Sequence, residues 1–223
     1  MTRLNEIPGP VGPLEALLDQ PHLHRGVGPD GIVHTGHADQ IRAAVVFGHP
    51  HPQYGGTMHT KVVYQAAKAL CRIGCAVLRF NFRGAGRSAG SFTDGPGEKD
   101  DFRAGIAFMR ERYPSAPIWA AGMSFGSWIA LSVGAEDERV SALIGVAPPL
   151  SRYDFGAVRD STKPKFFIQG ERDEICPLKE MQAFYAQAAE PKELAVIDGA
   201  DHLFDGKVSE VADAVEALLG DWQ

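Results

Sequence analysis

The feature that most constrains the fold is a series of six short apolar runs, alternating with helical segments from residue 43 onward. Each run is continuous rather than interrupted by polar residues, which is typical of strands covered on both faces. The runs are 43–47, 76–82, 118–121, 142–147, 166–168 and 194–197. Regular alternation of strand and helix predicts βαβ units, and therefore a mostly parallel central sheet with helices on both faces.

The expected helices lie between these runs and repeat their apolar residues at helical spacing. They cover residues 57–73, 100–112, 125–135, 178–189 and 208–219. The first forty residues are different, because glycine and proline divide them into short pieces. We expect this region to form antiparallel edge strands, one of them at 14–18. No domain linker is visible, so the expectation is a single α/β domain over residues 1–223.

Composition excludes several classes of protein. The 223 residues are 44% hydrophobic and 22% charged, which is ordinary for a globular chain and unlike a disordered or collagen-like one. A net charge of −6 argues against a nucleic-acid partner, since such surfaces are normally basic. No apolar run approaches the ~20 residues of a membrane span, and no signal peptide is visible. The three cysteines are an odd number, which favours free thiols and a cytoplasmic protein.

The pattern G-x-S-x-G occurs twice, centred on Ser88 and on Ser124. A nucleophile elbow needs a strand that runs into the serine and a helix that starts directly after it. Ser124 has both, whereas Ser88 follows a four-residue gap and precedes a glycine- and proline-rich segment. We therefore expect Ser124 to be a nucleophile, the alternative being a strand–helix turn without chemistry. Residues 84–89 also fit a dinucleotide fingerprint, but no helix opens there, so nucleotide binding is not expected.

A serine nucleophile needs a base, and the base needs a carboxylate that fixes its tautomer. Of eight histidines, His202 lies in a short loop after the last expected strand, where functional groups of an open parallel sheet gather. It also comes last in the Ser–Asp–His order of an α/β-hydrolase. We expect His202 to be the base. The N-terminal histidines His22, His24, His34 and His37 are expected at the surface.

The acid is expected in the loop after the strand at 166–168, which offers three carboxylates, Glu171, Asp173 and Glu174. We favour Asp173, which lies a few residues past the strand end, where a short side chain can reach an imidazole. The two glutamates are expected to be solvated turn residues. Asp201 is adjacent to His202, but side chains of sequence neighbours usually point apart.

A tetrahedral intermediate needs two backbone N–H donors. One is expected from Phe125, directly after the nucleophile, and the other from the loop 48–56 after the first central strand. The two prolines of that loop have no N–H. His51 is therefore the expected second donor, with Gln53 and Tyr54 left open as alternatives.

The same loop contains a His-x-His pair, His49 and His51, which could suggest a metal site. No carboxylate or third ligand accompanies the pair in the loop, whereas metal sites need at least three protein ligands. A loop that shapes the active site is the better interpretation. We therefore expect no metal and no organic cofactor.

With these residues placed, the chain resembles the α/β-hydrolase superfamily over residues 40–223. More closely, it is similar to a group of small, lidless, bacterial-type serine esterases and dienelactone-hydrolase-like proteins. The matching segments are 49–58, 79–88 and 122–126, together with the loops of Asp173 and His202. The resemblance implies an α/β-hydrolase fold and a serine-dependent ester hydrolase without metal or cofactor. Dienelactone hydrolases proper have cysteine at the elbow, where this chain has serine.

The resemblance also locates any cap. In this superfamily the cap follows the strand expected at 142–147, and here only about sixteen residues, 148–163, are available. A small lid and an open site favour esters with short to medium acyl groups. Loop 90–97 is expected to cover another edge of the pocket.

The expected activity is hydrolysis of a small-molecule carboxylic ester by Ser124, His202 and Asp173. Thioesters, lactones and acyl transfer require the same constellation, so they stay open as alternatives. A catalytically idle member of the fold, acting as a binding or scaffold protein, is the alternative from another class. The sequence does not indicate an oligomeric state.

Overall fold

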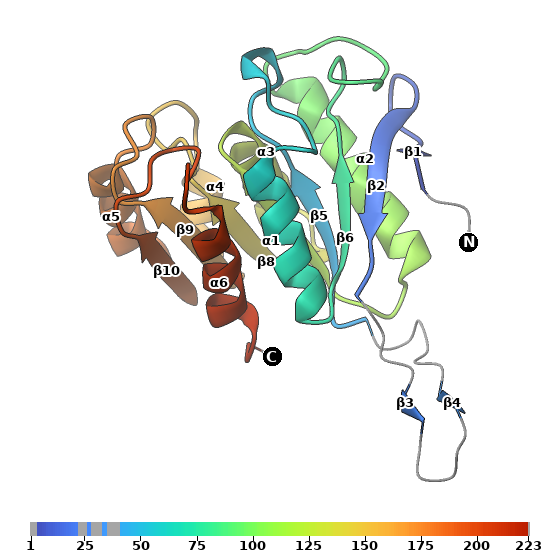
Figure 1. Cartoon of the computed structure of the whole chain (residues 1–223). Coiled ribbons are helices and arrows are strands. Elements are labelled where there is room, and N and C mark those ends of the chain that lie inside the picture. The colour runs from blue at the N-terminus through green and yellow to red at the C-terminus, as the bar shows by residue number, and fades with distance from the viewer. Residues whose placement is uncertain (1–3, 22–25, 28–32, 35–40, 223) are drawn as a thin grey trace.

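The computed structural model describes residues 4–21, 26–27, 33–34 and 41–222 of the chain. The expected surface positions of His22, His24 and His37, and of the His34 side chain, lie outside this description. The centre of the molecule is an eight-stranded sheet with the order β1-β2-β6-β5-β7-β8-β9-β10 (Figure 1). A separate two-stranded sheet joins β3 (Gly26–Val27) and β4 (Val33–His34).

The strands of the main sheet correspond closely to the apolar runs. They are β1 (Glu6–Ile7), β2 (Leu14–Asp19), β5 (Ala44–Gly48), β6 (Ala76–Phe80), β7 (Ile118–Met123), β8 (Val140–Val146), β9 (Lys165–Gly170) and β10 (Lys192–Ile197). From β6 to β10 all neighbours in the sheet are parallel, whereas β1 and β2 pair antiparallel at one edge. The predicted parallel sheet with antiparallel N-terminal strands is confirmed.

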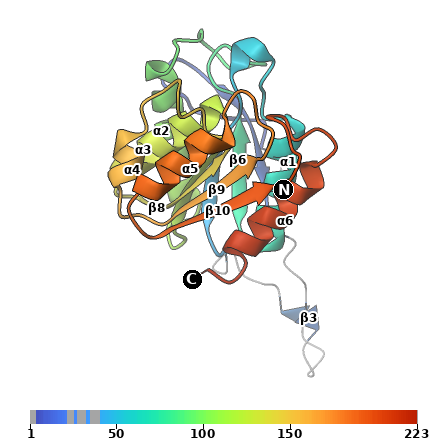
Figure 2. The ribbon, with the colours of Figure 1, turned by 90° about the vertical axis from the view of Figure 1, so that its left-hand side faces the viewer.

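Helices cover both faces of this sheet, as predicted (Figure 2). They are α1 (Lys61–Arg72), α2 (Pro96–Arg112), α3 (Phe125–Glu136), α4 (Gly156–Asp160), α5 (Leu178–Gln187) and α6 (Val208–Leu219), with a short 3₁₀ helix η2 (Pro52–Tyr54). Apolar residues of α1 and α6 belong to one core cluster, and those of α2, α3, α4 and α5 belong to the other. No described helix is long and apolar enough to cross a membrane.

The continuous apolar runs of the central strands are explained by these two cores, whereas Val196 of the edge strand β10 is exposed. In β5, Ala44 and Val46 belong to one cluster, whereas Val45 and Phe47 belong to the other, because successive side chains of a strand point to opposite faces. Each such valine or phenylalanine contributes about 1.5–3 kcal/mol by leaving water. A polar residue on either face would therefore be costly, and the run contains none.

The start of α2 differs from the sequence-based expectation. The helix begins at Pro96 rather than at residue 100, although Gly95, Pro96 and Gly97 suggested a loop. Proline is well suited to the first position of a helix, since its missing N–H has no partner there anyway. The fully buried carboxylate of Glu98 accepts a hydrogen bond from the Gly95 N–H at 2.7 Å and so closes the first turn.

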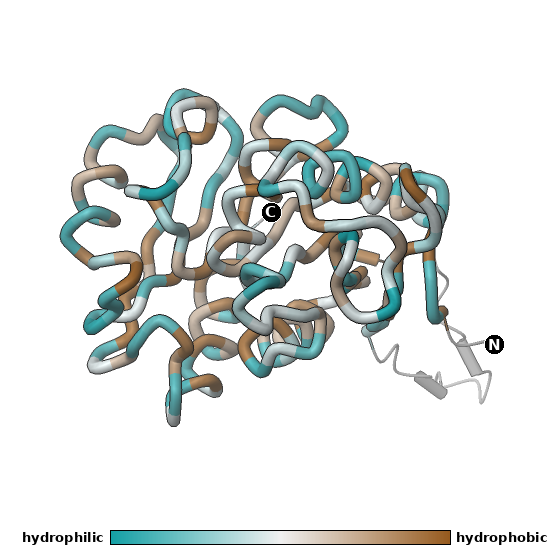
Figure 3. Tube along the Cα trace, turned by 90° about the horizontal axis from the view of Figure 1, so that it is seen from above, coloured by the Kyte–Doolittle hydropathy of each residue, from teal (hydrophilic) through white to brown (hydrophobic). Residues whose placement is uncertain are grey.

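The parallel strands all end at the same edge of the sheet, toward the top of Figure 1, and Figure 3 views the molecule from that side. The loops that follow β5, β6, β7, β8, β9 and β10 therefore meet at this edge. It is here that the structure places the residues singled out above.

Candidate active site

Ser124 is the single residue between β7 and α3. Its backbone has φ 52° and ψ −125°, a strained conformation that costs on the order of 1–3 kcal/mol and is found most often at functional sites. The glycines of the motif make the turn possible, because a Cβ at Gly122 would collide with the backbone of Gly126, and one at Gly126 with that of Gly48. The turn leaves the Ser124 side chain at the edge of the sheet, next to the loop after β10.

His202 lies in that loop and contacts two predicted partners. Its Nε2 is 3.0 Å from Oγ of Ser124, and its Nδ1 is 2.8 Å from Oδ2 of Asp173. An ionised carboxylate only accepts hydrogen bonds, so Nδ1 carries the proton and Nε2 has a free lone pair. Nε2 is therefore positioned to accept the hydroxyl proton of Ser124.

Four donors hold the buried Asp173 carboxylate. Oδ1 accepts from the backbone N–H of Ile175 at 2.9 Å and of Cys176 at 2.7 Å. Oδ2 accepts from Nε2 of Gln169 at 3.0 Å as well as from His202. Gln169 is fully buried at the end of β9, and its role was not predicted. A lone amide in an otherwise apolar strand core is the signal that could have indicated it.

The other carboxylates considered for the acid have different partners. Oε2 of Glu171 accepts from the backbone N–H of Gly199 at 2.7 Å, which ties the two loops together. Glu174 is exposed. Oδ1 of Asp201 accepts from backbone N–H groups of its own loop, at Leu203 and Asp205. Of these residues, only Asp173 contacts His202 in the described structure.

Two backbone N–H groups beside Ser124 have no acceptor within the described residues, those of Phe125 and His51. Their rings are in contact, with centroids 5.0 Å apart. The alternatives in the loop are engaged, because Gln53 N–H donates to Nδ1 of His51 at 3.3 Å and Tyr54 N–H donates to its carbonyl at 3.1 Å. Of the three candidates, only His51 has an N–H free to serve an oxyanion.

The neighbouring His49 is fully buried and holds this loop in place. Its Nε2 accepts from the backbone N–H of Phe82 at 3.0 Å, and Nδ1–H donates to the Pro50 carbonyl at 2.6 Å. Burial lowers the pKa of His49 to about 4, so the ring is neutral near pH 7. Both ring nitrogens are occupied by the protein itself, which leaves none for a metal.

Ser88, in the second G-x-S-x-G pattern, is part of the fold rather than of the site. Its buried hydroxyl donates to the Asn81 carbonyl at 2.6 Å and accepts from the Glu15 N–H at 2.9 Å. Both bonds are made to the backbone, and they fasten the 83–90 loop to β2 and β6. The hydroxyl therefore lacks the base that a nucleophile needs.

In the part of the chain that the structure describes, one group of side chains has the spacing of a metal site, Asp173, Cys176 and His202. Burial raises the pKa of the Cys176 thiol, so it stays protonated, and it donates to the Ala147 carbonyl at 3.4 Å. The carboxylate and the imidazole already bind each other. All three groups therefore already have partners within the protein, and a protonated thiol does not fit a cation.

A cavity of about 390 Å³ opens above Ser124, and we call it the Ser124 cavity. It is lined by Pro50, His51, Tyr54, Ser124, Phe125, Pro149, Arg152, Tyr153, Ile175, His202 and Leu203. Three of these, Tyr54, Leu203 and Ile175, are large apolar residues at its rim with 82%, 54% and 45% exposure. The segment after β8 borders the cavity and contains only the five-residue helix α4.

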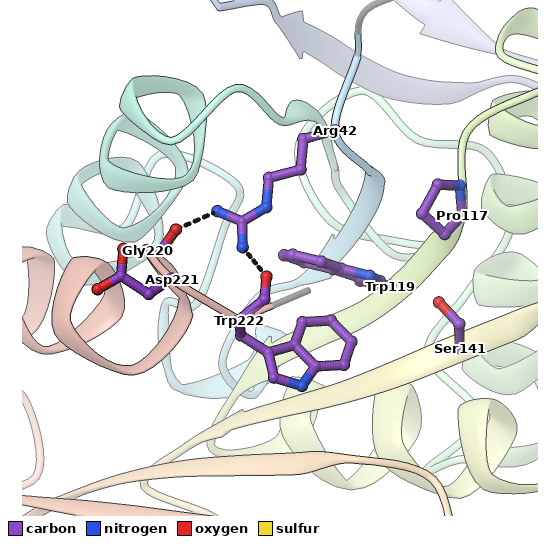
Figure 4. Close-up of a pocket in the computed structure, with 7 residues that line it drawn as sticks. All are labelled: Arg42, Pro117, Trp119, Ser141, Gly220, Asp221 and Trp222. Atoms are coloured by element: carbon purple, nitrogen blue, oxygen red, sulfur yellow. Dashed lines mark hydrogen bonds between the residues drawn. The ribbon is translucent and has the colours of Figure 1, made fainter.

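A larger hollow, of about 660 Å³, lies at the opposite end of the strands (Figure 4). Arg42 donates there to the carbonyls of Gly220, at 2.9 Å, and of Trp222, and its guanidinium lies over the Trp119 ring. These bonds fix the C-terminal end of α6 to the sheet. The hollow contains none of the predicted site residues.

Comparisons with known proteins agree with this fold. A family model described as "Serine aminopeptidase, S33" matches residues 39–159. An uncharacterised protein of Rickettsia prowazekii, RP471, is 34% identical over 180 residues, covering 77% of this chain and 76% of that protein. An α/β serine hydrolase homologue from Coxiella burnetii has a similar structure, with a TM-score of 0.86, 34% identity and 98% coverage of both chains.

A protein from Xanthomonas campestris, described as an α/β serine hydrolase without a lid, also has a TM-score of 0.86. It is 33% identical, and the alignment covers 99% of this chain and 94% of that one. The family model matches more than half of the chain, and the structural relatives match nearly all of it. The chain therefore belongs to the serine aminopeptidase S33 family within the α/β-hydrolase superfamily.

Proposed function

We propose that the protein hydrolyses carboxylic esters through a covalent intermediate on Ser124. The observation that carries the proposal is the continuous hydrogen-bonded chain from Ser124 Oγ through His202 to Asp173. This chain supplies a nucleophile, a base in the required tautomer, and a carboxylate that stabilises the imidazolium. The strained backbone at Ser124 and the two free N–H groups beside it also support it.

The proposed reaction runs in two halves. As Ser124 Oγ bonds to the acyl carbon, His202 Nε2 takes its proton, and the carbonyl oxygen becomes an oxyanion bound by the N–H groups of Phe125 and His51. His202 then returns the proton to the leaving alkoxide, and the alcohol departs. Next, water loses a proton to His202 and attacks the acyl carbon, which releases the acid and restores Ser124. Asp173 remains ionised throughout.

The Ser124 cavity supports esters with short to medium acyl groups, because it is apolar, open and about 390 Å³ in size. The small segment after β8 leaves it reachable from solvent. Thioester, lactone and acyl-transfer chemistry use the same groups, so a substrate panel must distinguish them. The idle-scaffold alternative receives no support from the site, whose hydroxyl, imidazole and carboxylate are all present and in contact.

A matched pair of serine variants tests the proposal. Ser124→Ala is expected to lower kcat on p-nitrophenyl esters by about 10³-fold or more, because nothing nearby replaces the nucleophile. Ser88→Ala is expected to keep its kcat, although it loses two buried hydrogen bonds and hence about 1–3 kcal/mol of stability. A panel of graded acyl length then defines the acyl preference.

A fluorophosphonate probe provides the second readout, independent of the ester chosen. It is expected to label Ser124 in the wild type and in Ser88→Ala, and to fail on Ser124→Ala. Labelling at Ser88, or a folded wild type that neither reacts with the probe nor hydrolyses any ester, would contradict the proposal.

We also propose that the protein acts in the cytoplasm on a small-molecule ester. The three cysteines are free and buried, and burial raises the pKa of both Cys71 and Cys75 to about 12. Free thiols are typical of reducing compartments. The net charge of −6 supports a partner other than nucleic acid.

A further inference from the structure

A hollow of about 620 Å³, separate from the one in Figure 4, adjoins the Ser124 cavity, and we call it the distal hollow. The two share His51, Tyr54, Arg152 and Tyr153. The distal hollow adds the polar side chains of Gln53, Thr93 and Asp94, and does not include the reacting serine or histidine. A substrate held at Ser124 would therefore reach the distal hollow with a part that does not react.

The polar groups of the distal hollow are largely unengaged. Among the described residues, no hydrogen bond or ion pair involves the side chain of Gln53, Asp94 or Arg152, or the hydroxyls of Tyr54 and Tyr153. Exposed charges of this kind add little to stability. Their gathering around one hollow beside a nucleophile is better explained by a ligand.

The two charges of the distal hollow have opposite sign and act on the same neighbours. Asp94 raises and Arg152 lowers the pKa of Tyr153, whose net rise is due first to burial. The same two residues act in opposite directions on His51. An anion that Arg152 attracts is therefore repelled by Asp94, and a cation that Asp94 attracts is repelled by Arg152. The arrangement disfavours a ligand with a single net charge.

Hydroxyl groups suit this arrangement, because each can donate to Asp94 and accept from Arg152. Gln53 can do both. Tyr54 and Tyr153 also line the hollow, so their ring carbons lie beside these polar groups. A sugar or polyol combines several hydroxyls with apolar C–H faces and carries no charge.

Two parts of the wall of the distal hollow, the Asp94 backbone and the Tyr153 ring, are held by other residues of the protein. Asp94 has a positive φ of 55° and lies between two residues that bind the buried Glu98, Thr93 N–H at 2.9 Å and Gly95 N–H at 2.7 Å. Tyr153, which also lines the hollow, stacks on Trp128 with ring centroids 4.1 Å apart. Such preorganisation reduces the ordering cost of binding.

We propose that the distal hollow is a subsite for a hydroxyl-rich group, a sugar or polyol, joined to the ester that Ser124 cleaves. Arg152 and Asp94 determine this specificity, and Arg152 lies where the distal hollow meets the Ser124 cavity. The inference rests on the proposed ester hydrolysis. It specifies the class of substrate, which the hydrolytic groups alone leave open.

The test compares kcat/KM for two esters of the same acid, 6-O-butyryl-glucose and ethyl butyrate. A second pair, ethyl gluconate and ethyl hexanoate, places the hydroxyls on the acid side. In at least one pair, the wild type is expected to prefer the hydroxyl-rich ester by about 10-fold or more, since hydrogen bonds to charged groups are stronger than those between neutral groups. Equal rates in both pairs would overturn the subsite.

Variants link the preference to the two charges. Arg152→Gln and Asp94→Gly, in which glycine suits the positive φ, are each expected to reduce the preference by about 10-fold. The exposed Arg112→Gln and Asp213→Asn are matched controls on other surfaces and should retain the wild-type ratio. A preference that survives both Arg152→Gln and Asp94→Gly would refute the assignment.

Charged esters and a binding measurement complete the test. Faster hydrolysis of monoethyl succinate or of butyrylcholine than of the butyryl sugar would show that the ligand class is wrong. If the folded wild type cleaves no ester, the proposed function fails, and saturation-transfer NMR with methyl β-glucoside then decides the subsite. Binding that is lost in Arg152→Gln supports the subsite, and absence of binding overturns it.

Discussion

Acid should destabilise the protein through one buried residue, His49. Its neutral ring accepts from the Phe82 N–H and donates to the Pro50 carbonyl, so a second proton would place two N–H groups against each other. Burial lowers its pKa from the ordinary 6.5 to about 4. The unfolded chain therefore binds a proton below about pH 6.5, whereas the native state resists it until about pH 4.

The sign and size of the effect follow from this gap. The stability that neutral His49 provides is fully present above pH 6.5 and is lost as the pH falls from 6.5 to 4. A gap of about 2.5 pH units, at about 1.36 kcal/mol each, corresponds to about 3 kcal/mol in total. By about pH 5 the loss should reach about 2 kcal/mol.

Urea unfolding followed by tryptophan fluorescence measures this loss in the wild type and in His49→Gln at about pH 7.5 and about pH 5. Glutamine can hydrogen-bond but does not titrate, and the carboxylates that titrate in both proteins cancel in the comparison. The stability advantage of the wild type should shrink by about 2 kcal/mol on acidification. The exposed His59→Gln should show no such change relative to the wild type.

Equal acid losses in the wild type and in His49→Gln would refute the reasoning, because they would mean that His49 protonates without cost. The outcome also bears on activity. His49 holds the loop that carries the free N–H of His51, so its protonation should disturb this proposed oxyanion donor as well as the fold.

Two further outcomes are expected at Asp173, the proposed acid, and at the amide that binds it. Asp173→Asn should lose at least ~10²-fold in kcat, because an amide favours the wrong imidazole tautomer. Glu171→Gln, which still accepts from the Gly199 N–H, and the exposed Glu174→Gln should keep kcat within a few-fold of the wild type. Steady-state kinetics on folded variants measure this, and a large loss of kcat in either glutamate variant would reassign the acid. Gln169→Leu removes the amide bonds to Asp173 and to the Cys176 carbonyl, and should cost about 1–3 kcal/mol, because removing the amide oxygen, which already lacks a partner, offsets part of the loss. Urea titration checks this, and unchanged stability would mean that these bonds do not hold Asp173.

Much of the fold could be predicted because its strands are covered on both faces. Residues such as Val45 and Val46 must both be apolar when each faces a different core, so the runs stand out in the sequence. The start of α2 was missed because Gly95 and Pro96 stop most helices, and only the buried Glu98 shows that they begin this one. α4 has five residues, too few for a periodic pattern.

The residues of the candidate site could be located from local context together with their order along the chain. Ser124 is marked by a strand before it and a helix after it, and His202 and Asp173 by their places after strands. What local context could not provide is the direction of each hydrogen bond. The choice among His51, Gln53 and Tyr54 depends on which N–H groups are already engaged, and no spacing in the sequence carries that information.

The distal hollow shows a further limit of sequence patterns. Its two charged residues follow different strands, Asp94 after β6 and Arg152 after β8, and neither belongs to a recognisable motif. They meet because parallel strands end at one edge, while Glu98 and Trp128 fix the loops that carry them. The groups for bond cleavage need a strict local geometry that leaves a pattern, whereas groups for substrate choice need only reach the same space. Two chains with the same elbow can therefore differ in substrate at positions that no motif records.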